Sequence, residues 1–151
     1  MKRINYRYCI ALPIVILFLL WLNDVMSYSR RIGNTHFYLV ESTAIPKEGN
    51  DRLVELCYKS DRESGDFSGV SMPGYPKTIL WNDKYIISKN YDGYKEDIIS
   101  YVVINQNSVN VKTEEIEEIY YFTSEDDYKR FLRQISLSEQ GMNLTGNRIL
   151  W

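Results

Sequence analysis

Hydrophobic and polar positions follow three different patterns along this chain. Residues 9–22 are continuously apolar. Between residues 36 and 105, short β-favouring runs alternate with turn-rich breaks, and closer to the end apolar residues recur at helical spacing. These patterns predict an α+β fold: a small antiparallel β-meander sheet packed by a C-terminal amphipathic helix, after an N-terminal hydrophobic segment.

The middle of the chain carries the strand signals. The runs "HFYLVES" (36–42) and "RLVELCYK" (52–59) are rich in β-favouring residues and are bounded by polar stretches. In "TILWNDKYIISK" (78–89), two such runs flank the Asn-Asp pair at 82–83, which tolerates the left-handed backbone of a two-residue hairpin turn. A further run, "DIISYVVIN" (97–105), follows a short loop. The hairpin and this last strand together predict the meander.

The helix signal lies in "SEDDYKRFLRQISL". Tyr128, Phe131, Leu132 and Ile135 fall at i, i+3, i+4 and i+7, which is one stripe of a helix. Ser124 is placed to cap the first turn, and three acidic residues follow it at the positive end of the helix dipole. We expect this helix to cover one face of the sheet.

A second helical spacing precedes it. In "EEIEEIYY" (114–121), four glutamates cluster around Ile116, Ile119 and Tyr120. This spacing favours a charged outer helical face above a buried stripe.

Length and patterning together predict a single domain, because 151 residues leave room for one core. Residues 1–27 are interpreted as a signal anchor or signal peptide, and residues 28–35 as a short tether. Residues 36–137 form the predicted β-rich domain that ends in the helix, and residues 138–151 form a C-terminal tail.

The N-terminal segment has the layout of an export signal: cations, an apolar block, then a polar stretch. Cleavage near Ser27 would release a secreted or periplasmic protein. Retention would leave residues 8–26 as a single membrane span, with Tyr8 and Trp21 at the two interfaces. Lipid attachment would need a cysteine after the apolar block, and Cys9 lies at the beginning of that block, which excludes this route. Either reading places the folded part in the cell envelope, outside the cytoplasm.

Net charge and cysteine content limit the classes of partner and the disulfides that we expect. Without residues 1–27 the chain keeps 15 of its 18 cations and 19 of its 20 anions, a net charge near −4. No basic patch with interleaved aromatics stands out, so we expect no nucleic-acid partner. The two cysteines, Cys9 and Cys57, fall in different parts of the chain, which predicts no disulfide framework.

Side chains that usually perform chemistry are scarce. His36 is the only histidine, and we interpret it as a structural or surface residue. Cys57 stands in an apolar stretch typical of a small buried hydrophobe. The acidic loop "DRESGD" (61–66) lacks the regular spacing of oxygen ligands in a calcium site. The sequence therefore predicts no catalytic residue, no metal site and no cofactor.

Aromatic residues are the best candidates for a ligand face. The chain has 13 tyrosines, and a tyrosine ring packs well while its hydroxyl stays hydrated. Four aromatic residues lie in or beside predicted loops: Tyr75, Trp81, Tyr91 and Tyr94.

The segments "FYLVE", "ILWNDKYIISK" and "YVVIN", followed by a capped helix, give residues 36–137 a resemblance to a group of small, uncharacterised bacterial envelope domains. Members of that group are often lipid-anchored, whereas this chain lacks the required cysteine. The resemblance implies a β-rich fold with a terminal helix and an envelope location. It implies no activity.

These observations favour a non-catalytic binding module that contacts another envelope protein outside the cytoplasm. Two alternatives remain open. One is an inhibitor or immunity-type protein against a secreted toxin or hydrolase. The other is a carboxylate-based hydrolase of envelope polymers, which would need two acids facing a cleft.

Overall fold

The computed structural model describes part of the chain: Leu17 and residues 29–42, 53–59, 67–95, 97–110 and 115–146. Apart from Leu17, these residues belong to one compact unit, Ser29–Ile149. Among the described residues, no helix is long and apolar enough to cross a membrane. The predicted signal or anchor at residues 1–27, including the stretch 8–26, lies outside the described residues except for Leu17.

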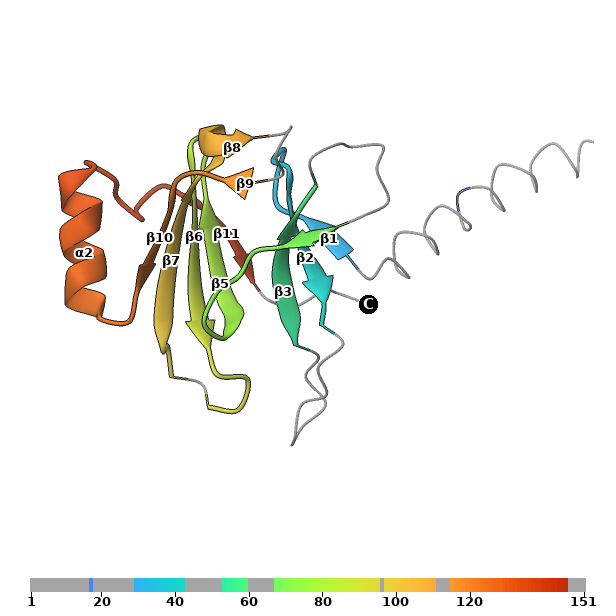
Figure 1. Cartoon of the computed structure of the whole chain (residues 1–151), viewed down its shortest axis with the longest axis horizontal. Coiled ribbons are helices and arrows are strands. Elements are labelled where there is room, and N and C mark those ends of the chain that lie inside the picture. Colours follow the sequence, from blue (N-terminus) through green and yellow to red (C-terminus); the bar gives the residue numbers. More distant parts are fainter. Residues whose placement is uncertain are drawn as a thin grey trace, which may run out of the picture. The chain divides into compact units, whose positions relative to one another are not determined.

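The larger of the two main sheets has five antiparallel strands. Its centre is the predicted meander, in which consecutive strands pair with each other, and one further strand joins each side (Figure 1). In sheet order the strands are β10 (Ile119–Phe122), β7 (Ser100–Asn105), β6 (Tyr85–Tyr91), β5 (Tyr75–Trp81) and β11 (Asn143–Gly146). The α+β class and the antiparallel meander are thus confirmed.

The turn between β5 and β6 differs from the predicted one. Neither residue of the Asn-Asp pair has a positive φ angle, so the turn does not use the left-handed backbone. Instead, the Asn82 side-chain oxygen accepts hydrogen bonds from the backbone N–H groups of Lys84 (2.9 Å) and Tyr85 (2.7 Å). The Asn82 side chain therefore takes the place of a backbone turn.

A second sheet has four antiparallel strands. They are β1 (Ser29–Arg31), β2 (Phe37–Glu41), β3 (Val54–Tyr58) and β4 (Ser68–Gly69), paired in that order. The strands β2 and β3 match the predicted runs. Residues 28–35 include β1 and the fully buried Ile32, so most of the predicted tether belongs to the domain. Residues 138–151, predicted as a tail, likewise contribute β11.

Two short strands form a separate pair. These are β8 (Val109–Asn110), which follows the 3-10 turn Gln106–Ser108, and β9 (Glu115–Ile116). With β10, they correct the helical prediction for residues 114–121. The reason is local: the run "IYYF" favours strands and pairs along its full length with β7. The helical spacing of Ile116, Ile119 and Tyr120 is misleading, because all three residues lie in strands.

Hydrophobic cores lie on both faces of the five-stranded sheet, because successive strand residues point to opposite faces. Ile86 and Ile104 face the four-stranded sheet and join a cluster with Phe37 and Leu56. Ile87, next to Ile86, packs in a second cluster with Tyr128 and Leu132 of the helix α2 (Glu125–Gln134). The five-stranded sheet therefore lies between the helix and the smaller sheet (Figure 1).

The helix itself agrees with its prediction. Ser124 is its N-cap, and the Ser124 hydroxyl accepts a hydrogen bond from the Asp127 backbone N–H at 3.4 Å. Tyr128 and Leu132 are its buried residues, and the half-buried Phe131 packs with them. The ring of Tyr128 is stacked on Tyr101 of β7, with centroids 4.5 Å apart.

Candidate binding groove

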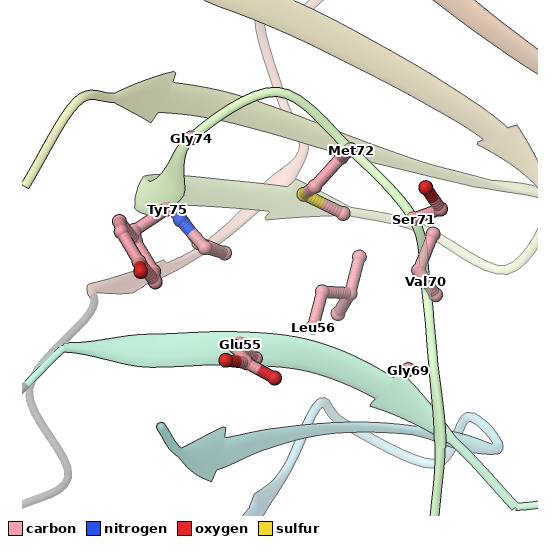
Figure 2. Close-up of a pocket in the computed structure, with 9 residues that line it drawn as sticks. Glu55, Leu56, Gly69, Val70, Ser71, Met72, Gly74 and Tyr75 are labelled. Atoms are coloured by element: carbon pink, nitrogen blue, oxygen red, sulfur yellow. The ribbon is translucent and has the colours of Figure 1, made fainter. Parts of the chain in front are cut away.

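A groove of about 400 Å³ lies between β3 and the segment that leads from β4 into β5 (Figure 2). We call residues 70–74 of that segment the strap. The groove is lined by Glu55, Leu56, Gly69, Val70, Ser71, Met72, Gly74, Tyr75 and Pro76.

Apolar side chains form part of the groove, beside a larger area of polar surface. Leu56 projects from β3 toward Met72, which points back from the strap, and the two side chains face each other across the space (Figure 2). Leu56 is 1% exposed, whereas Met72 and Val70 are partly buried and pack against the core between the sheets. Methionine is flexible and polarizable, which suits a surface that adapts to a bound side chain.

One carboxylate, that of Glu55, stands on the rim. This side chain is exposed, and its Oε1 accepts a hydrogen bond from the Ser42 hydroxyl at 2.5 Å. The bond orients the carboxylate without neutralising it. Because Glu55 is the only charged residue among those lining the groove, the groove carries a single negative charge beside the apolar side chains of Val70 and Met72.

The strap is held in place by side chains from distant strands. The Tyr121 hydroxyl of β10 donates to the Ser71 carbonyl oxygen at 2.8 Å, and the Ser100 hydroxyl of β7 donates to the Pro73 carbonyl oxygen at 2.7 Å. Ser100 in turn accepts from the Asn90 side-chain amide at 3.2 Å. Ser100 and Asn90 are buried, so the bonds of Ser100 are shielded from water, whereas the bond of Tyr121 is exposed.

Gly74 lets the strap approach the sheet. Its φ angle is +77°, and a Cβ added there would collide with the backbone oxygen of Tyr91. Only glycine adopts this backbone conformation without strain and fits this space.

The four predicted ligand-face residues separate into two places. Tyr75 lines the groove, and Tyr91 is its cross-strand partner. Tyr94, 57% exposed, lies in the turn after β6. Trp81 lies at the opposite end of β5, where its Nε1 donates to the Thr145 hydroxyl at 3.1 Å and its ring covers Gly33. Three of the four thus lie at the groove end of β5 and β6, whereas Trp81 packs against the core.

Sequence reasoning missed most of the groove. Leu56 is predicted as a strand residue with no role in binding, and Met72 falls in "SMPGYP", which looks irregular. No spacing in the sequence indicates that this loop crosses to β3. The proline and glycines around Met72 mark a break but not its partner in space.

Of the other residues singled out in the sequence, the structure describes His36 and Cys57. His36 is exposed and directly precedes β2. Cys57 is 5% exposed, and burial, together with the nearby Glu55 charge, raises the pKa of its thiol to about 11. It is thus a buried hydrophobe, as predicted, and a poor nucleophile. The acidic loop 61–66 lies outside the described residues.

A second polar cluster lies on the helix side of the sheet. Glu139 accepts hydrogen bonds from the Lys89 ammonium and the Tyr128 hydroxyl, both at 2.6 Å. Burial opposes ionisation of Glu139, but these two donors outweigh it, so the pKa of the carboxyl is lowered. Burial and the neighbouring carboxylate raise the pKa of Tyr128. All three groups are partnered, and together they tie the segment after the helix to β6.

Within the described part of the chain, no group of three or more His, Cys, Asp or Glu side chains is arranged to hold a metal ion. No protein-family model matches the sequence, and no curated protein or solved structure is significantly similar to it.

Proposed function

We propose that this protein is a non-catalytic binding module of the cell envelope, held or released outside the cytoplasm, and that its groove receives part of a partner protein. The observation that carries the proposal is an open groove in which the partly buried Met72 and Val70 offer apolar surface beside polar groups, with the buried Leu56 facing Met72. A groove of about 400 Å³ is in the size range of ligand sites in proteins.

The chemistry of the groove favours binding over catalysis. Glycoside hydrolysis by the usual mechanism needs two carboxylates flanking the scissile bond, and the residues that line this groove supply one. No histidine, cysteine or lysine lines it. The side chains of Val70 and Met72 favour an apolar side chain of the partner, while Glu55 on the rim favours a neighbouring cation.

The test is photo-cross-linking of the full-length chain in cells that naturally make it. A photo-activatable phenylalanine replaces Ser71, which is exposed on the groove, and in a control protein it replaces Arg133, exposed on α2. We expect a discrete adduct with one envelope protein from position 71 and none from position 133.

A second variant separates groove binding from chance proximity. Met72→Glu, combined with the position-71 cross-linker, places a charge where the apolar partner group is expected and should abolish the adduct. An unchanged adduct in this variant, or the absence of any adduct from position 71, would contradict the proposal. A cross-linked secreted toxin or hydrolase would assign the module to the inhibitor class.

A further inference from the structure

The strand β11 forms one edge of the five-stranded sheet. It pairs with β5 in antiparallel register, with Leu144 opposite Leu80 and Thr145 opposite Ile79. Among the strands of the described residues, none pairs with its outer side. An edge strand of this kind presents backbone donors and acceptors that another chain can use.

The direction of the backbone groups follows from the hairpin next to it. The Asn82 N–H donates to the Tyr85 carbonyl oxygen, so Asn82 and, two residues earlier, Leu80 direct their N–H and C=O groups toward β6. Ile79 therefore directs its groups toward β11 and bonds to its partner Thr145. Leu144, one residue along, then directs its own N–H and C=O away from the sheet.

The same direction applies to Gly146, two residues after Leu144. Both residues are exposed, and Leu144 is 70% exposed. The strand "NLTG" carries no charge, no proline and no bulge, so its four-residue length is the one protective feature of an edge strand that its own sequence supplies. Its exposed backbone groups and its leucine are thus open to a partner strand.

We propose that β11 pairs with β11 of a second copy of this chain. In an antiparallel arrangement about a two-fold axis, Leu144 lies opposite Leu144 of the partner, and the two residues exchange both of their outward hydrogen bonds. Asn143 then faces the partner's Thr145, so an amide meets a hydroxyl. The pairing buries the exposed leucines against each other and continues the five-stranded sheet into the partner.

A second copy fits this edge because the strand is complementary to itself. It is uncharged, so no like charges meet across the axis, and its most apolar side chain meets its own equivalent. This inference rests on the sheet edge and is independent of the groove.

The test is sedimentation equilibrium of the full-length chain in density-matched detergent. The wild-type protein is expected at twice its chain mass of 17.9 kDa. Leu144→Asp and Leu144→Lys should each sediment at the single-chain mass, because like charges then face each other across the axis. An equimolar mixture of the two variants should return to the doubled mass, because Asp then faces Lys.

The two charged variants also distinguish a dimer formed through β11 from a dimer formed through another surface. Position 144 is exposed in the single chain, so both variants should keep the wild-type circular dichroism spectrum, and Tyr94→Asp, on a different exposed loop, should leave the doubled mass unchanged. A wild-type protein at the single-chain mass, a Leu144→Asp protein at the doubled mass, or a mixture that stays at the single-chain mass would each overturn the proposal.

Discussion

Gly74 shows how one residue shapes the groove. Its positive φ angle lets the strap turn, and its missing side chain lets the strap lie against Tyr91. Gly141 also has a positive φ angle, of +90°, but a Cβ added there would meet nothing within 4 Å. Substitutions at these two glycines therefore separate the cost of backbone strain from the cost of a steric collision.

We predict that Gly74→Ala lowers the free energy of unfolding by about 2–4 kcal/mol, since strain and a backbone collision add. Gly141→Ala should cost only about 1 kcal/mol, because strain acts alone. Urea unfolding of the two variants and the wild type measures both values. Equal losses in the two variants would show that the strap does not press against the sheet.

At the scale of elements, the Glu139 cluster joins three parts of the chain: β6 through Lys89, α2 through Tyr128, and the segment that leads to β11. The folded state lowers the pKa of Glu139 from its ordinary value of 4.5. The stabilisation from its ionised form is therefore fully present above pH 4.5 and is lost as the pH falls through the lower folded-state value.

We predict that Glu139→Gln lowers the free energy of unfolding by about 1 kcal/mol at pH 7, because the ion pair with Lys89 is lost while Tyr128 keeps an acceptor. The difference from wild type should shrink as the pH falls below 4.5. Chemical unfolding at several pH values measures it. Glu125→Gln, in the exposed pair with Lys129, is the control and should change stability by less than about 0.5 kcal/mol. A difference that stays constant down to pH 3 would contradict this account.

Elements with strong local signals could be predicted from the sequence. The strand β6 and the helix α2 combine a clear period with a turn or cap, and both lie where expected. The strands β10 and β11 could not be predicted, because their pairing depends on distant partners. "IYYF" shares its apolar spacing with a helix, and "NLTG" has too few β-favouring residues to indicate a strand.

The residues that line the groove were harder to predict from the sequence than the strands were. Tyr75 is a candidate in the sequence because it is aromatic and near a loop, and the structure places it on the groove. Leu56 and Met72 lie 16 positions apart, and nothing in either local pattern indicates that they face each other. A site built between two sheets depends on how the sheets pack, and single-sequence patterns do not encode that directly.

At the scale of the whole molecule, the strap is the segment of the chain that connects the two main sheets. It leaves β4 of the smaller sheet, bonds to β10 and β7 through Tyr121 and Ser100, and enters β5 of the larger sheet. The groove is thus built on rigid elements, which is what a preorganised binding site requires. The edge strand β11 lies on the side of β5 opposite β6, and none of the described strands pairs with its outer side.

The central claim is that the groove binds a partner protein and that Met72 contacts that partner. Its most direct measurement is the affinity of the purified full-length protein for the cross-linked partner, by calorimetry, for wild type, Met72→Glu and the exposed-helix control Gln134→Ala. We predict at least a tenfold weaker affinity for Met72→Glu at a temperature where circular dichroism shows that the variant is folded, and no change for Gln134→Ala. Equal affinity of Met72→Glu and wild type would contradict the claim.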